Sequence, residues 1–174
     1  MDRPEAALVR AAALGDAAAF DQLARSVQGH VWRYVLHLVG DPSLADDVVQ
    51  EVLLRVHRKL GTLRDPDRFV PWLLALARNA AYDAGRARRR HQLHLVSDQE
   101  AVETRAAVDP HLSVEIEDAL SRLSPDLKEA LVMIGIVGLS YEEAAPALGV
   151  PEGTVKSRVF RARKQLLEIL NSVV

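Results

Sequence analysis

The segment from residue 152 to residue 170 carries hydroxyl and guanidinium groups at a spacing suited to DNA. If it is a helix turning 100° per residue, one face collects Thr154, Ser157, Arg158, Arg161, Lys164 and Gln165. The opposite face collects Val155, Val159, Ala162, Leu166 and Ile169, which would seal a core. Arginine can bond O6 and N7 of guanine together, and serine or threonine can bond bases or phosphates. We expect the polar face to contact DNA, with a merely solvated amphipathic helix as the alternative.

Charge is unevenly distributed along the 174 residues, although the formal net charge is only −2. Residues 86–90 (RARRR) hold four bases and no acid, and residues 151–174 hold five bases and two acids. Between them, residues 91–150 hold three bases and eleven acids. Local basic clusters are typical of nucleic-acid contact even when the total charge is small. We expect two DNA-contacting patches flanking an acidic middle, although either patch alone is equally compatible with a solvated helix face.

Composition and motif content disfavour several other classes of protein. No apolar run approaches the roughly 20 residues of a membrane span, the first residues do not resemble a signal peptide, and cysteine is absent. There is no glycine-rich phosphate loop or nucleophile motif, and His91 and His94 have no third metal ligand near them. We therefore expect a cytoplasmic protein that is not an enzyme and that has no metal and no cofactor.

The basic segment is predicted to be the second helix of a helix-turn-helix. Ser140 and Glu143 form a capping box at the start of a short helix. A tight turn, residues 148–151 (LGVP), separates that helix from the basic one. Ser124 and Pro125 can begin an earlier helix. A short helix, a glycine-containing turn and a longer basic helix together are typical of DNA-binding proteins.

The first 90 residues are predicted to form a helical bundle. Asp16 can cap a first long helix that ends at residues 40–42 (GDP), and Ser43 with Asp46 resembles a capping box for the next. A loop over residues 61–67 precedes a third helix, from about residue 68 to residue 90.

The apolar stripe fades over residues 91–111, where four acids and one base indicate a flexible linker. The fold prediction is all-α. Two small helical domains, residues 1–90 and 112–174, are joined by the flexible linker at 91–111, and the C-terminal one is a helix-turn-helix.

Two sets of motifs resemble one known family, and they occur in that family's order. Residues 138–145 (GLSYEEAA) and 148–163 (LGVPEGTVKSRVFRAR) resemble region 4 of the extracytoplasmic-function sigma factors of bacterial RNA polymerase. Residues 46–52 (DDVVQEV), together with Phe69, Trp72 and residues 77–79 (ARN), resemble region 2. A helix-turn-helix alone is weak evidence for a family, but the pair covers most of the chain.

The resemblance implies three binding surfaces. The C-terminal domain would read the minus-thirty-five promoter element through Glu152, Gly153, Thr154, Lys156, Ser157, Arg158, Phe160, Arg161 and Arg163. The N-terminal domain would recognise the minus-ten element as melted single strand through Arg64, Arg68, Arg78, Asn79, Asp83, Arg86, Arg88, Arg89 and Arg90. The clamp coiled coil of the polymerase largest subunit would be contacted by Asp46, Asp47, Gln50, Glu51 and Arg55. Without the resemblance, this last set would be read as a solvated polar face.

Five residues keep alternative readings. Trp32 and Trp72 could be stacking platforms for bases, but both lie on apolar stripes, which favours core packing. Phe160 lies near DNA in the family, whereas periodicity is equally compatible with packing between helices. Pro146 falls six residues beyond Ser140, where a helix-interior proline costs on the order of 3 kcal/mol, which puts the length of that helix in doubt. Pro71 lies early in its helix, with an uncertain effect.

The resemblance implies an alternative sigma factor that binds core RNA polymerase and directs promoter-specific transcription initiation. The implied partners are core polymerase (through its clamp coiled coil and flap), promoter DNA and an anti-sigma protein. Two alternatives stay open: a dimeric helix-turn-helix repressor or activator, and a sigma-like mimic that only sequesters an anti-sigma protein. Co-purification with core polymerase would exclude the repressor, and a dependence of transcription on the basic residues would exclude the mimic.

Overall fold

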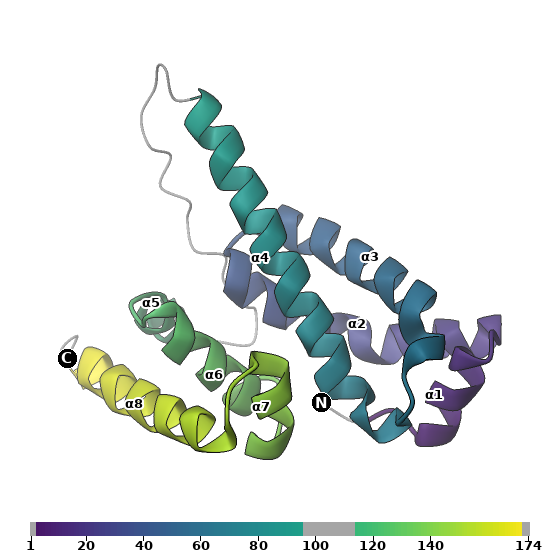
Figure 1. The fold of residues 1–174 in the computed structure, drawn as a ribbon. Coiled ribbons are helices and arrows are strands. Elements are labelled where there is room, and N and C mark those ends of the chain that lie inside the picture. Colours follow the sequence, from purple (N-terminus) through teal and green to yellow (C-terminus); the bar gives the residue numbers. More distant parts are fainter. Residues whose placement is uncertain (1–2, 96–113, 172–174) are drawn as a thin grey trace.

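The computed structural model describes residues 3–95 and 114–171, and within these ranges all regular structure is helical, as predicted (Figure 1). The N-terminal domain contains α1 (Ala6–Ala13), α2 (Ala17–Val39), α3 (Pro42–Lys59) and α4 (Phe69–Leu95), with 3₁₀ turns η1 (Leu60–Thr62) and η2 (Pro66–Arg68) between α3 and α4. The C-terminal domain contains α5 (Val114–Ser121), α6 (Pro125–Gly135), α7 (Tyr141–Leu148) and α8 (Glu152–Asn171). None of the described helices is both long and apolar enough to span a bilayer.

Caps in the sequence determine where α2 and α3 begin. The Asp16 carboxylate accepts a 3.0 Å hydrogen bond from the backbone N–H of Ala19 and starts α2. Gly40 ends α2 at φ +69°, a left-handed conformation that glycine adopts without strain. Asp41 caps α3 by accepting from the backbone N–H of Leu44 at 2.9 Å. The predicted Ser43 cap is therefore wrong by two residues, because Pro42 already occupies the first helical position, which suits proline.

The N-terminal core forms where the apolar stripes of α2, α3 and α4 meet. The helices α2, α3 and α4 contact one another pairwise, and α1 packs on α2. The buried side chains at the centre, all with at most 2 % exposure, are Leu23, Val27, Val31, Tyr34, Val52, Val56, Phe69, Leu73, Leu74 and Ala77. The apolar faces of these three helices are thus the faces that are buried.

The C-terminal domain has the predicted helix-turn-helix. Ser140 and Glu143 form both hydrogen bonds of a capping box at the start of α7. Gly149, at φ +68°, turns the chain from α7 into α8. Pro146 lies inside α7, which nevertheless continues to Leu148, so this proline does not shorten the helix. The helices α6 and α7 both pack against α8.

Besides the start of α3, two helices and one boundary differ from the sequence-based expectation. The short helices α1 and α5, eight residues each, were not predicted. The helix α4 continues to Leu95, so the chain stays helical for five residues beyond the predicted start of the linker at 91. The rest of that predicted linker, residues 96–111, lies outside the described residues, as do the side chains of His91 and His94.

The two domains pack against each other. The helix α6 contacts α2, and α7 contacts α4. In Figure 1 the α5–α8 group lies beside the N-terminal half of α4, whereas the last turns of α4 project away from the rest of the molecule. This arrangement brings acidic residues of the C-terminal domain to the predicted minus-ten surface.

Candidate nucleic-acid interface

The helix α8 presents its predicted polar face to solvent. Val155, Val159 and Ala162 have at most 1 % exposure, so the apolar face is sealed against α6 and α7. Ser157, Arg161, Arg163 and Lys164 are exposed, as are Glu152, Gly153 and Lys156 at the start of the helix, while Thr154 is half-buried. The Phe160 ring is 71 % exposed, so it does not pack between helices.

Arg158 is held differently from the other arginines of α8. Its side chain is 16 % exposed, and its Nη2 donates a 2.7 Å hydrogen bond to Oδ2 of Asp126 on α6. Arg161 lies one turn further along α8 and is exposed, with a 3.4 Å bond to the Ser157 carbonyl. The helical projection placed both arginines on one exposed face, but in the structure Arg158 is held against α6 and only Arg161 is exposed.

Lys156 is also engaged locally. Its Nζ lies 2.6 Å from the Glu152 carboxylate and 5.8 Å from the centre of the Tyr141 ring. The hydrogen bond to Glu152 raises the pKa of Lys156, so this cation stays charged at neutral pH. A flexible, charged amine at the edge of the helix suits contact with backbone phosphates.

Four of the predicted minus-ten residues lie together on α4. Arg78, Asn79, Asp83 and Arg86 line a surface recess of about 540 Å³, here called the α4 recess, together with Tyr82. The guanidinium carbon of Arg78 lies 5.1 Å from the centre of the Tyr82 ring, and Arg86 pairs with Asp83. The recess thus combines cations with an aromatic face, the combination that single-stranded nucleic acid favours.

A buried carboxylate of the C-terminal domain contacts one end of this recess. Glu129 of α6 has 0 % exposure, and its Oε1 accepts a 2.8 Å bond from Nε of Arg78 and a 2.9 Å bond from the Tyr34 hydroxyl. Its Oε2 accepts a 3.2 Å bond from the Tyr82 hydroxyl.

The electrostatics of this cluster favour charged Arg78 and protonated Tyr34. Burial opposes the Arg78 charge, but the hydrogen bond and charge of Glu129 outweigh it and raise the pKa of Arg78. Burial, and then the Glu129 charge, raise the pKa of Tyr34 well above its usual value, so its hydroxyl remains a donor. The same causes raise the pKa of Tyr82.

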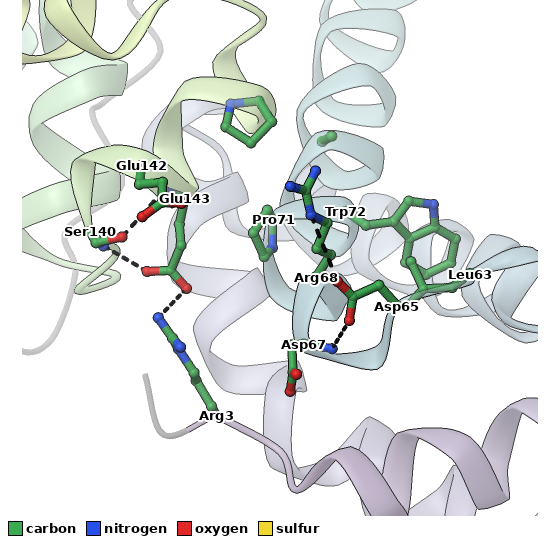
Figure 2. A pocket seen from close by; sticks show the side chains of 12 residues that line it. Arg3, Leu63, Asp65, Asp67, Arg68, Pro71, Trp72, Ser140, Glu142 and Glu143 are labelled. Atoms are coloured by element: carbon green, nitrogen blue, oxygen red, sulfur yellow. Dashed lines mark hydrogen bonds and ion pairs between the residues drawn. The ribbon is translucent and has the colours of Figure 1, made fainter.

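The predicted minus-ten loop borders a cleft between the domains (Figure 2). This cleft, about 710 Å³, is lined by Asp65, Arg68 and Trp72 on one side and by Ser140 and Glu143 on the other. Arg64 and Arg68 are both exposed, and Nε of Arg68 lies 3.9 Å from Oδ2 of Asp65.

Arg3 crosses the same cleft. Its Nη2 lies 2.5 Å from Oε1 of Glu143, and Figure 2 shows the two side chains pointing toward each other. Burial alone would raise the pKa of Glu143, but its hydrogen bonds with Ser140 and Arg3 lower it. The capping carboxylate of α7 is therefore also an inter-domain contact.

Residues 88–90, the end of the basic run on α4, contain one structural and two exposed arginines. Nη1 of Arg88 donates a 2.7 Å bond to Oδ2 of Asp41, the cap of α3. The Leu44 backbone hydrogen bond and then Arg88 lower the pKa of Asp41. Arg89 and Arg90 are exposed and available to phosphates.

The predicted polymerase-docking residues form the outer face of α3. Asp46, Asp47 and Gln50 are exposed. Glu51 and Arg55 pair at 2.7 Å, and the hydrogen bond from Arg55 lowers the pKa of Glu51.

The two tryptophans sit at the edge of the core. The half-buried Trp32 donates its indole N–H to Oδ1 of Asp46 at 2.8 Å. Trp72 packs against the core with its ring centre 6.2 Å from that of Phe69, while also lining the cleft of Figure 2. Both tryptophan side chains are partly buried against the core, in agreement with the core-packing interpretation that the sequence favours.

Two further residues belong to these surfaces, although the sequence analysis missed them. Leu54 is 57 % exposed on the outer face of α3, off the stripe that contains Val52 and Val56. An apolar residue off the stripe is the signal that could have identified it. Tyr82 lies four residues from both Arg78 and Arg86, and this helical spacing places an aromatic ring among the predicted cations.

The comparisons with known proteins agree with the geometry. Residues 23–91 match the model of sigma-70 region 2, and residues 113–166 match the model of sigma-70 region 4. The RNA polymerase sigma factor CarQ of Myxococcus xanthus is 33 % identical over 158 residues, covering 89 % of this chain and 91 % of that protein. The ECF RNA polymerase sigma factor SigC of Mycobacterium tuberculosis is 34 % identical, covering 95 % of this chain and 91 % of its own length.

A solved structure extends the similarity to the fold. The sigma factor RpoE of Bartonella quintana, in complex with the anti-sigma factor NepR, superposes with a TM-score of 0.74 at 33 % identity, covering 87 % of this chain and 96 % of that one. A chain with region 2 before region 4, whose described residues contain only helices as regular structure, is a sigma factor of the sigma-70 type. The chain belongs to the extracytoplasmic-function sigma factors, the alternative sigma factors that bind core RNA polymerase and direct promoter-specific transcription initiation.

Proposed function

We propose that the two domains divide promoter recognition between them, with residues 112–174 reading the minus-thirty-five element. The observation that carries this proposal is the exposed cationic and hydroxyl face of α8. Arg161 and Ser157 project from the middle of that face, where they can reach base edges in a major groove. Lys156 and Arg163 lie at its flanks and would bind phosphates.

Residues 1–90 bind the melted minus-ten strand in the α4 recess and along the loop that contains Arg64 and Arg68. The Tyr82 ring supplies a stacking surface for an unpaired base, and Arg78 and Arg86 supply charge for the backbone. Arg89 and Arg90 extend the cationic track along α4.

The outer face of α3 docks on core polymerase. Exposed carboxylates such as Asp47 supply specificity, and Leu54 supplies an apolar centre that becomes buried on docking. Trp32 is a positioning residue here, because its indole N–H fixes the carboxylate of Asp46. The chain itself performs no catalysis in this scheme, and it works in the cytoplasm, where polymerase and promoters are found.

An anti-sigma protein is the regulatory partner we propose. Support comes from the similar sigma factor RpoE, which was solved with its anti-sigma factor NepR.

Run-off transcription with core polymerase, on the promoter of the chain's own operon, tests the proposal. Leu54→Asp should abolish co-purification with core and transcription together, because it places a charge in the apolar centre of the docking face. Leu167→Asp is the matched control, since Leu167 is exposed to a similar degree (60 % against 57 %) on α8 and lies outside the proposed docking face. Equal losses from both variants, or full activity of Leu54→Asp, would contradict the assignment of α3.

A further inference from the structure

Glu129 connects the C-terminal domain to the residues that are proposed to bind the minus-ten strand. It lies on α6, and its three donors come from α2 and α4, at sequence separations of 47 to 95 residues. Because Nε of Arg78 is bonded to its carboxylate and the Tyr82 hydroxyl to its other oxygen, both groups are engaged within the chain. The Glu129 carboxylate thus takes up donors that a nucleic-acid phosphate could otherwise accept from.

Two further contacts between the domains also pair an acid of the C-terminal domain with a basic residue of the N-terminal domain. Glu117 of α5 lies 3.7 Å from the imidazole of His37 on α2, and both are buried. Glu143 of α7 pairs with Arg3 ahead of α1. In each of these contacts the acid comes from the C-terminal domain and its partner from the N-terminal domain. The acidic excess of residues 91–150 therefore includes residues that contact the N-terminal domain directly.

From this arrangement we propose that Glu129 is an autoinhibitory latch: it holds α6 against Arg78, Tyr34 and Tyr82, and so closes the free chain over part of its own minus-ten surface. The proposal rests on the proposed function for the identity of the covered surface. The closed and DNA-bound states are mutually exclusive, because Arg78 and Tyr82 cannot turn fully to a DNA strand while they are bonded to Glu129.

Energetic considerations explain why such a latch can open. Burying the Glu129 carboxylate and most of the Arg78 side chain removes hydration from both, and their attraction repays this only in part, so the ion pair gives little net stability. Removing one partner is far more damaging, since it leaves the other charge buried without compensation. The closed state therefore depends on both members of the pair, and binding of core polymerase can open it.

The absence of cysteine makes a direct measurement simple. Cysteines introduced in place of exposed Gln22 on α2 and Glu168 on α8 accept a donor and an acceptor dye. Single-molecule energy transfer on the full chain then reports domain separation without DNA or polymerase. The wild-type pair should give a dominant high-transfer population, and Glu129→Gln should shift most molecules to lower transfer. Asp118→Asn, which alters an exposed acid of the same domain that pairs with nearby Arg122, is the matched control and should leave the distribution unchanged.

The same variants are then titrated with a fluorescein-labelled oligothymidine of roughly 15 nucleotides, long enough for the recess. Glu129→Gln should bind it about tenfold more tightly than wild type, the factor expected if closed molecules outnumber open ones by about ten to one. Tyr34→Phe removes one donor from the opposite domain and should shift transfer and affinity in the same direction, which covers the case in which Glu129→Gln fails to fold.

Unchanged energy transfer in both Glu129→Gln and Tyr34→Phe would overturn the latch, as would opening without any gain in single-strand affinity. Failure of the proposed function has a different signature, because transcription with core polymerase would then be absent even though the domains open on substitution.

Discussion

Nη2 of Arg158 on α8 lies 2.7 Å from Oδ2 of Asp126 on α6, while Arg161, three residues further along α8, is exposed to solvent. The first arginine ties α8 to the helix behind it, and the second extends into solvent. A helical projection assigns both to one polar face, but the contact with Asp126 holds only Arg158 against α6.

Arg161→Ala should cost roughly 1–3 kcal/mol on the preferred promoter and relax specificity at one base position, because it removes a base contact. Lys156→Ala should instead weaken binding to all sequences alike and flatten the salt dependence, because it removes a phosphate contact. Binding of holoenzyme to a library of minus-thirty-five variants at several salt concentrations measures both effects. Uniform losses from the two substitutions would contradict the assignment of Arg161 as a base reader.

Arg158→Ala should lower the free energy of unfolding as well as DNA affinity, because it removes the hydrogen bond that ties α8 to Asp126 of α6. The Asp126 side chain is 63 % exposed, and a solvent-exposed ion pair of this kind contributes about 0.2–1 kcal/mol. Chemical denaturation gives the stability, and the exposed Arg161→Ala provides the comparison, since it should leave stability nearly unchanged. A stable Arg158→Ala chain that loses binding at one base position only would reverse the two assignments.

Pro146→Ala should raise the melting temperature of the chain. The helix α7 continues through this position to Leu148, so alanine restores a backbone donor and relieves the clash of the proline ring. The gain is limited to about 3 kcal/mol and is reduced by the greater freedom of the unfolded chain. Thermal unfolding followed by circular dichroism measures it, and an unchanged or lower melting temperature would mean that proline fits this helix without strain.

Most of the fold can be predicted from the sequence because the stripes and caps are local. Asp16, Ser140 and Gly149 do what their types and positions predict, and the basic helix begins at Glu152 as expected. The short helices α1 and α5 escape prediction because eight residues contain barely two turns of periodic pattern. The Ser43 cap fails because Asp41 with Pro42 forms a competing start two residues earlier.

Which residues make up the binding surfaces can also be predicted from the sequence, but the partners that these residues contact cannot. The family resemblance assigns Arg78, Asp83 and Arg86 to one binding surface, and they do line one recess. The partner of Arg78 is Glu129, which is 51 residues away in the chain and unrelated to it by any periodicity. Long-range pairing of a buried carboxylate depends on how two domains dock, and no local pattern encodes that.

The Asp41 cap should make a contribution to the free energy of unfolding of the N-terminal domain that depends on pH. The Leu44 backbone hydrogen bond and then Arg88 lower its pKa below the ordinary value of 3.8, so the folded state favours the carboxylate. Its contribution is therefore complete above the unfolded pKa and is lost as pH falls through the folded one. Asp41→Ala should cost about 0.5–2 kcal/mol at neutral pH, and this difference from wild type should shrink below pH 3.8.

Asp41→Asn is the control for that titration. It keeps an oxygen that can cap α3 but carries no charge, so its stability relative to Asp41→Ala should not vary over the same pH range. The measurement is urea unfolding at a series of acid pH values. If the Asp41→Ala difference stays constant down to pH values well below 3.8, the carboxylate does not contribute as described.

The central claim is that this chain reads a promoter as part of polymerase holoenzyme rather than alone. Residues 91–150 carry eleven acids against three bases, which offsets the attraction of the two basic patches for phosphate. Docking on core would separate the acidic residues from the duplex and let the two domains bind as one multivalent unit.

Fluorescence anisotropy on a labelled fragment of the operon's own promoter, at near-physiological salt, tests this claim most directly. We predict that adding core polymerase raises the affinity at least about tenfold, or 1.4 kcal/mol. Tight, sequence-specific binding by the isolated chain that core polymerase does not change would contradict the account.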